Sequence, residues 1–299
     1  MVGRTKARPY FCSARPPNCA TLHSYLLPLF LSSSQKKSPD YFIICSLWFI
    51  FVNSNTTAMK TMLFRIYQWV IAYPILAVLT ILTAVLTILV SALGMSRSLG
   101  YYIPHIWARL WCILLFVRVE VRGRENIDPG TSYVFIANHQ GAFDIFVIFG
   151  YLNHNFKWMM KKSLEKIPFV GFACRVSRHI MVDRSSASAI NQTMVNAKKI
   201  LRDGMSLVVF PEGSRTPDGK MKPFKRGAFM LATEFGLPIV PLSIDGSFQV
   251  MNKRTLNTAP GKIVLTIHKP LPQTGERTKE VMESMMAESF AIIKSALDE

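Results

Sequence analysis

The sequence is short of cysteine and of acidic residues, and both shortages narrow the possible functions. It contains no Cys-x-x-Cys pair, which argues against zinc-finger spacing and indicates free thiols in a reducing compartment; the five cysteines are Cys12, Cys19, Cys45, Cys112 and Cys174. Only 18 acidic residues face 35 lysines and arginines, giving a formal net charge of +17. The basic residues are dispersed, without RNA-binding aromatic motifs, so they suit an anionic membrane or acidic substrates better than nucleic acid.

The sequence also lacks a Gly-x-Ser-x-Gly motif, which argues against a serine nucleophile on a strand-to-helix elbow. What it has is apolar residues, 50% of the chain. Trp69 to Leu93 carries no charge over 25 residues, enough at about 1.5 Å per residue to cross a hydrocarbon core of roughly 30 Å. This run predicts a membrane helix. Ile106 to Val117 is apolar but short, so the pair could form a single span or a helical hairpin that dips into one leaflet.

Three regions follow from this pattern. Residues 1–58 are predicted to be a disordered or mis-called extension, because Met59 opens a basic stretch of the kind that starts many membrane proteins. Residues 59–116 are expected to anchor the chain in a membrane, with the active site at the cytoplasmic face. Residues 117–299 are expected to form an α/β domain.

From Val117 onward, short β-rich runs alternate with amphipathic helices, which predicts a central mostly parallel or mixed sheet of about seven strands flanked by helices. The candidate strands are Val117–Val121, Tyr133–Ala137, Lys157–Met160, His179–Val182, Leu207–Phe210, Ile239–Ile244 and Ile263–His268. One helical face carries Ala187, Ile190, Met194, Ala197 and Leu201, with Gly204 as a C-terminal cap. The apolar face of the last helix is predicted to be core; it comprises Met282, Met285, Met286, Phe290, Ile293 and Leu297.

The stretch from Ser132 to Asp144 contains the first candidate for chemistry. An apolar strand breaks there into a polar turn, and a helix follows. In one continuous helix, His139 and Asp144 would lie roughly 140° apart and could not touch. The turn allows the carboxylate to bend back to the imidazole, fix its tautomer and favour its protonated form. Alternatively, His139 could be an ordinary hydrogen-bonded surface residue at the end of a strand, and Asp144 could simply be favoured by the helix dipole in the first turn of a helix.

A second polar cluster, Pro211 to Thr216, follows the strand that ends at Phe210. Open α/β sheets bind ligands at this edge. Arg215 offers a planar fork suited to phosphate, and Gly213 allows backbone amides to approach an anion. The alternative is a loop held by an internal pair between Glu212 and Arg215.

Taken together, these stretches resemble the glycerolipid acyltransferases, specifically the 1-acylglycerol-3-phosphate acyltransferases that make phosphatidic acid. The resemblance covers roughly residues 59 to 270. Its four motifs are matched by Asn138-His139 with Asp144, by Met181 to Arg184 preceded by Lys161, by Phe210 to Thr216, and by Ile239 to Leu242. The hydroxyl residues Ser214 and Thr216 are exchanged relative to the usual pattern. Ser163 stands where relatives often carry Glu.

The resemblance implies transfer of an acyl chain from acyl carrier protein or coenzyme A to the free hydroxyl of lysophosphatidic acid, with no cofactor and no metal. His139 is the implied general base and Asp144 orients it. The implied substrate-binding residues are Asn138, Lys161, Arg184, Glu212, Gly213, Ser214 and Arg215, and the lipid membrane is an implied partner.

Three other functions remain open from the sequence. The same chemistry could act on another lysolipid or on a glycerol phosphate, since His139 and Asp144 carry no information on the acceptor. A metal-dependent membrane phosphatase would use histidine and aspartate as metal ligands, although no second cluster completes such a site. A non-catalytic membrane tether would not require His139, Asp144 and Arg215 together.

Overall fold

The computed structural model describes residues 56–95, 100–183, 185–202, 205–255, 257–271 and 278–297. By its internal contacts the chain divides into residues 1–61 and 62–299, and the sheet, the site and the cavity described below lie in the second unit. Several sequence predictions fall outside the described residues: almost all of the extension 1–58, the site residue Arg184, the helix cap Gly204, and Cys12, Cys19 and Cys45. The described cysteines, Cys112 and Cys174, are free thiols.

A seven-stranded mixed sheet forms the centre of the fold, with strand order β1-β7-β6-β2-β5-β3-β4. β6 and β7 pair antiparallel and the other neighbours pair in parallel, so β1 and β7 run opposite to the remaining five. The predicted fold class is confirmed, and each predicted strand overlaps an observed one. The strands are β1 (Val117–Arg122), β2 (Val134–Ala137), β3 (Phe156–Lys161), β4 (Ile180–Val182), β5 (Ser206–Val209), β6 (Ile239–Asp245) and β7 (Gly261–Ile267).

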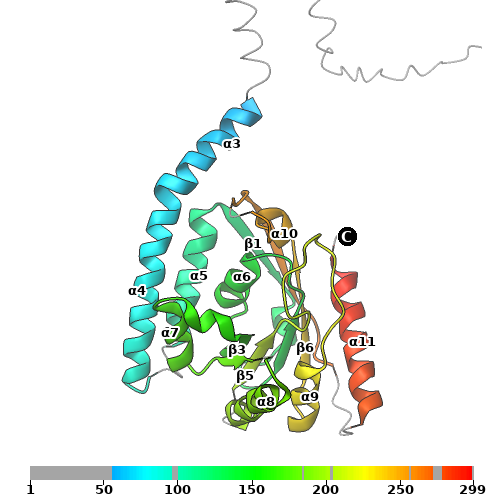
Figure 1. Ribbon diagram of the computed structural model, residues 1–299. Coiled ribbons are helices and arrows are strands. Elements are labelled where there is room, and N and C mark those ends of the chain that lie inside the picture. The colour runs from blue at the N-terminus through cyan, green and yellow to red at the C-terminus, as the bar shows by residue number, and fades with distance from the viewer. Residues whose placement is uncertain are drawn as a thin grey trace, which may run out of the picture. The chain divides into compact units, whose positions relative to one another are not determined.

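Helices cover both faces of the sheet, which is why the central strands are apolar throughout (Figure 1). All residues of β2 and β5 are buried. One face packs against α5 (Tyr102–Leu114) and α6 (Phe143–Tyr151). The other packs against α8 (Ala187–Arg202), α9 (Gly227–Phe235) and α11 (Lys279–Ser295). The methionines of α11 are core, as predicted, but Ile190 on the predicted inner face of α8 is 46% exposed.

The helix Ala58–Ala92 is, among the described residues, long and apolar enough to cross a membrane. It consists of α3 (Thr56–Tyr67), the π-helical turn η1 (Gln68–Ala72) and α4 (Tyr73–Ala92). α4 packs against α5 and against α7 (Val170–Val176), as Figure 1 shows. The predicted short apolar segment forms α5, which buries Ala108 and Cys112 against the domain.

The remaining short helices are the 3-10 turns η2 (Arg124–Asn126) and η3 (Lys162–Lys166), and α10 (Ser247–Val250) after β6. Because β5, β2 and β6 are parallel neighbours, the residues after Val209, Ala137 and Asp245 meet at one edge of the sheet. Two of the polar clusters identified in the sequence follow β2 and β5, so the topology brings them together.

Candidate active site

The turn between β2 and α6 brings His139 and Asp144 into contact, as the geometric argument predicted. His139 Nδ1 lies 2.8 Å from Asp144 Oδ2. The aspartate is completely buried, whereas the histidine side chain is 14% exposed and lines a cavity. The pair therefore has one fixed end inside the protein and one end available to a ligand.

Four groups donate to the Asp144 carboxylate. Besides the histidine, the backbone amides of Gln140 and Gly141 donate to Oδ2, at 2.7 and 2.9 Å, and the Ser247 hydroxyl donates to Oδ1. A carboxylate surrounded by donors requires the proton of the neutral imidazole to sit on Nδ1. His139 Nε2 is then left with a lone pair that can accept a proton.

Two aromatic rings hold the imidazole from the side. Phe210 stacks on His139 with ring centres 3.9 Å apart and planes inclined by 9°. Trp158 of β3 stacks in turn on Phe210, at 5.4 Å and 25°. This three-ring stack restricts the orientation of the histidine ring.

Glu212 holds the backbone of His139 and not the side chain of Arg215. One Glu212 carboxylate oxygen accepts from His139 N at 2.8 Å, and the other accepts from Lys222 N at 3.0 Å. Burial raises the pKa of Glu212 to about 7, although these two amides and the charge of Lys222 act in the opposite direction. The internal pair between Glu212 and Arg215, left open by the sequence, is therefore wrong; Glu212 is a positioning residue in this geometry.

The loop after β5 is fastened at several other points. Thr216 N donates to His139 O at 3.0 Å. Lys222 Nζ donates to the carbonyl oxygens of Ser214 and Arg215 and, at 2.7 Å, to Ser214 Oγ. Gly213 adopts a φ of 77° and donates its amide to Phe210 O at 2.9 Å. Its amide is thus already used inside the loop, which the Thr216 amide also ties to the turn after β2.

Two predicted basic groups reach the cavity. Arg215 is half-buried, and within the described residues its side chain pairs with no carboxylate. Lys161, at the end of β3, is exposed and lines the same cavity. Asp183 of the second motif pairs at 2.7 Å with Lys162, whose hydrogen bond holds the pKa of Asp183 below its usual range.

Asn138 does not face the cavity. Its side chain is fully buried and binds the backbone of Ile244 twice, with Nδ2 donating to the carbonyl and Oδ1 accepting from the amide, each at 2.8 Å. These bonds tie the end of β2 to β6. In this geometry Asn138 is a positioning residue, because its side chain is fully buried and does not line the cavity.

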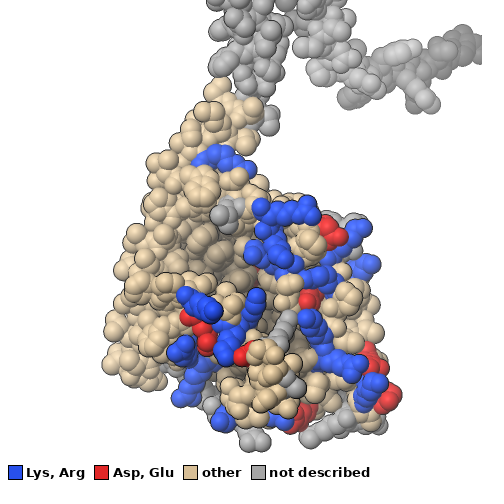
Figure 2. Space-filling model, in the orientation of Figure 1, with Lys and Arg blue, Asp and Glu red and all other residues tan. Residues whose placement is uncertain are grey.

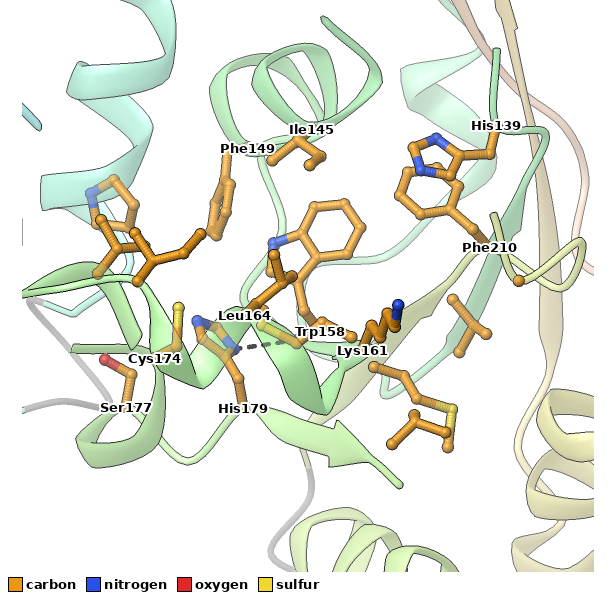
Figure 3. A pocket seen from close by; sticks show the side chains of 18 of the residues that line it. His139, Ile145, Phe149, Trp158, Lys161, Leu164, Cys174, Ser177, His179 and Phe210 are labelled. Carbon is orange, nitrogen blue, oxygen red and sulfur yellow. Dashed lines mark hydrogen bonds between the residues drawn. The ribbon is translucent and has the colours of Figure 1, made fainter. Parts of the chain in front are cut away.

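His139 and Phe210 lie at one end of a cavity of about 1010 Å³ (Figure 3). Its walls are mainly apolar and come from α4, α6, η3, α7 and β3. This volume is at the upper end of the range typical for small-molecule sites. Figure 2 shows lysines and arginines gathered over the α/β domain in that view, whereas the surface of α4 there is uncharged. The site thus joins an apolar interior to a basic surface.

Three features of the site were not predicted from the sequence, namely Ser247, Lys222 and the stacking role of Phe210. Ser247 could have been predicted, because Asp245-Gly246-Ser247 is a polar cluster at the C-terminal end of β6, the edge where open α/β sheets bind ligands. Lys222 carries no such signal, since it lies in a loop ten residues after its partner Glu212. No group of three or more His, Cys, Asp or Glu side chains placed to hold a metal occurs in the described part of the chain.

Comparison with known proteins shows which proteins this chain is similar to. Residues 118–245 match the family model described as "Acyltransferase". The chain is 29% identical over 219 residues to a 1-acyl-sn-glycerol-3-phosphate acyltransferase of Chlamydomonas reinhardtii, covering 72% of this chain and 64% of that protein. It is 28% identical to the enzyme of that name from Pseudomonas aeruginosa, covering 77% and 87%.

One solved structure is similar to this chain in both fold and sequence. The crystal structure of the 1-acyl-sn-glycerophosphate (LPA) acyltransferase PlsC from Thermotoga maritima matches with a TM-score of 0.66 and 27% identity, covering 80% of this chain and 95% of that one. Among the sequence relatives, the match spans 64% of the length of the Chlamydomonas reinhardtii protein, 51% of that of a Brassica napus relative and 49% of that of an Arabidopsis thaliana relative. The residues that match the acyltransferase family model contain both the paired His139 and Asp144 and the loop that holds them, and the chain is similar to the named enzymes over this region.

Proposed function

We propose that this protein transfers an acyl chain from an acyl thioester to the sn-2 hydroxyl of 1-acylglycerol 3-phosphate, giving phosphatidic acid. One observation carries the proposal: the His139–Asp144 pair stands at the end of a large apolar cavity, with Arg215 and Lys161 beside it. The relatives named 1-acyl-sn-glycerol-3-phosphate acyltransferase support the same acceptor.

The chemistry needs one base and no covalent intermediate. His139 Nε2 takes the proton of the acceptor hydroxyl as its oxygen attacks the thioester carbonyl, and Asp144 stabilises the resulting imidazolium through Nδ1. The tetrahedral adduct then collapses, the carbon–sulfur bond breaks, and the imidazolium returns the proton to the leaving thiolate. General-base catalysis of this kind typically contributes about 10²- to 10⁴-fold.

The basic groups suit the acceptor's phosphate. The guanidinium of Arg215 can bind two phosphate oxygens in parallel, and its freedom from carboxylate partners in the described residues leaves both donors available. Lys161 adds a second positive charge at the same cavity. A lysophospholipid without a phosphate monoester would use these groups less well, because its headgroup carries less negative charge.

The apolar walls suit an acyl chain. Each buried methylene contributes about 0.8 kcal/mol, so most of a single-chain lipid's affinity comes from hydrocarbon kept out of water. The apolar helix Ala58–Ala92 brings the enzyme to a membrane, and we place the active site at its cytoplasmic face. The donor is acyl carrier protein or coenzyme A, both acidic and therefore attracted to the basic surface.

Purified protein should convert lysophosphatidic acid to phosphatidic acid with either thioester, and lysophosphatidylcholine should be a poor acceptor. The His139→Ala variant should lose at least about 100-fold in kcat while keeping its melting temperature. The control for His139→Ala is Lys279→Ala, a surface substitution on helix α11, which does not line the cavity. This control should keep wild-type turnover. His139→Ala with more than a tenth of wild-type turnover would contradict the proposed mechanism.

A further inference from the structure

The short elements η3 and α7 and the turn between them carry large apolar side chains on the protein surface. From Val117 onward, seven large hydrophobic residues are exposed among the described ones, and four of these lie within nine residues of the chain. The four, which we call the η3–α7 patch, are Leu164, Ile167, Phe169 and Phe172, with exposed fractions of 37%, 44%, 52% and 51%. Single exposed apolar residues are ordinary, but a group of them marks a contact with a partner or a membrane.

The helix α7 is apolar on both of its sides. Val170, Ala173 and Cys174 line the cavity, whereas Phe172 is not among the lining residues. Arg175 is the single charged residue of the helix. A helix that is hydrophobic all round is normally buried, yet half of Phe172 is exposed. The side of α7 that faces away from the cavity therefore lacks the apolar partner that its composition requires.

The turn that leads into α7 presents Phe169 in a strained backbone conformation. Phe169 has a φ of 60° and a ψ of −53°, and Val170 N donates to Pro168 O at 2.6 Å. These values describe a γ-turn of the rare, strained kind. The turn is also closely packed, because a Cβ at Gly171 would lie 2.2 Å from Glu165 O. The Phe169 side chain belongs to neither buried core, so packing inside the described part of the protein does not explain the strain.

The η3–α7 patch adjoins the apolar outer surface of α4. α7 packs against α4 (Figure 1), and α4 exposes large apolar residues of its own, such as Leu82 and Leu86. Positions 161 to 178 also carry five basic residues and one acidic residue, Glu165. The five are all exposed, and they are Lys161, Lys162, Lys166, Arg175 and Arg178. Aromatic side chains beside lysines and arginines are typical of segments that lie in the interface of an anionic membrane.

We propose that the η3–α7 patch inserts into the membrane interface beside α4, with Phe169 and Phe172 in hydrocarbon and the neighbouring basic residues at anionic headgroups. A bilayer fits this surface better than a protein partner does, because the patch adjoins a helix that is itself apolar enough for lipid. The inference rests on the membrane association in the proposed function, but on no step of the acyl transfer. It sets the cavity at the level of the lipids, since Leu164 and Ile167 of the patch also line the cavity.

The apolar gain is large enough to hold the patch in the membrane. Moving the exposed half of one phenylalanine side chain into hydrocarbon shifts a partition equilibrium by roughly 3- to 10-fold. Phe169 and Phe172 together therefore favour the inserted position by roughly 10- to 100-fold. At that ratio either residue should contact lipid for most of the time.

A photoreactive benzoylphenylalanine in place of Phe172 tests this contact in the full-length protein. The protein is placed in vesicles of phosphatidylcholine and phosphatidylglycerol and illuminated, and its adducts are identified by mass spectrometry. The same reporter at Leu86 of α4, which is 50% exposed, is the positive reference. The reporter at Met230 of α9, which is 49% exposed on the opposite face of the sheet, is the matched control. A reporter at Phe169 repeats the measurement within the strained turn.

Positions 169, 172 and 86 should form lipid adducts, and position 230 should form at least about tenfold less. All four variants should keep the wild-type melting temperature, because each replaced side chain is about half exposed. Lipid adducts at position 86 but not at 169 and 172 would overturn the inference and leave the membrane association standing. Their absence at all four positions would remove both. Adducts from position 172 to protein, either a second copy or another part of this chain, would also overturn the inference. Turnover is not measured, so the outcome is independent of the proposed acyl transfer.

Discussion

The Glu212→Gln substitution tests how the loop after β5 supports His139. Glu212 is 4% exposed and binds the amides of His139 and Lys222 with its two oxygens. Glutamine keeps one acceptor oxygen but turns an NH₂ group toward the other amide, so one buried donor loses its partner. Removing such a partner costs about 1 to 3 kcal/mol.

The pH dependence of this variant is more diagnostic than its average stability. Burial raises the pKa of Glu212 from 4.5 to about 7. Between these values the unfolded chain has lost the proton and the folded chain still holds it, so stability falls as pH rises. At about 1.4 kcal/mol per pKa unit, Glu212 removes about 3 kcal/mol from the unfolding free energy across this window. Glutamine does not titrate and lacks this contribution.

Melting temperatures of both proteins in one detergent, from pH 4.5 to 8, measure the effect. One kcal/mol corresponds to about 2 to 4 °C for a domain of this size. The wild-type advantage over Glu212→Gln should therefore shrink by roughly 6 to 12 °C as pH rises to 7 and stay constant above it. Glu288→Gln, an exposed glutamate on α11, should show no such change. Parallel curves for wild type and Glu212→Gln would refute the account of a buried, high-pKa carboxylate.

Three further outcomes follow from the same site. Ser247→Ala removes the donor to Asp144 Oδ1 and should lower kcat about tenfold with both KM values unchanged; a KM effect alone would count against it. Gly141→Ala places a methyl group 2.5 Å from Ser247 O and should cost about 1 to 3 kcal/mol by thermal melting as well as activity. Arg215→Lys should raise KM for lysophosphatidic acid by at least about tenfold, leaving the melting temperature and the donor's KM unchanged, whereas a selective donor defect would remove Arg215 from the acceptor site.

Local patterning was sufficient to predict most of the fold. All seven strands were predicted because β-rich runs such as Val134 to Ala137 are short, apolar and bounded by polar turns. The strand order was not predicted, since parallel pairing leaves no trace in one sequence. The exposure of Ile190 was also missed, because helical periodicity does not reveal that the inner face of α8 ends beside a cavity.

The candidate site, like the fold, could be predicted from the sequence only in part. The contact between His139 and Asp144 followed from chain geometry over five residues, so it could be predicted. The partners of Glu212 could not, because they depend on how two loops at neighbouring strand ends pack. Arg215 is the nearest cation to Glu212 in sequence and was a reasonable partner for it. In the folded chain the Glu212 carboxylate is buried and accepts a hydrogen bond from the backbone amide of His139 instead.

The helix α4 shows why composition alone could not assign its role. Its outer residues, such as Ile81, Leu82 and Leu86, are large, apolar and about half exposed. Its cavity side carries small residues and threonines whose hydroxyls bind within the helix, among them Thr87. Mean hydropathy counts both faces as apolar and predicts a membrane segment. In the proposed function this difference gives α4 two roles, because its outer side meets lipid and its inner side forms a wall of the cavity that takes the acyl chain.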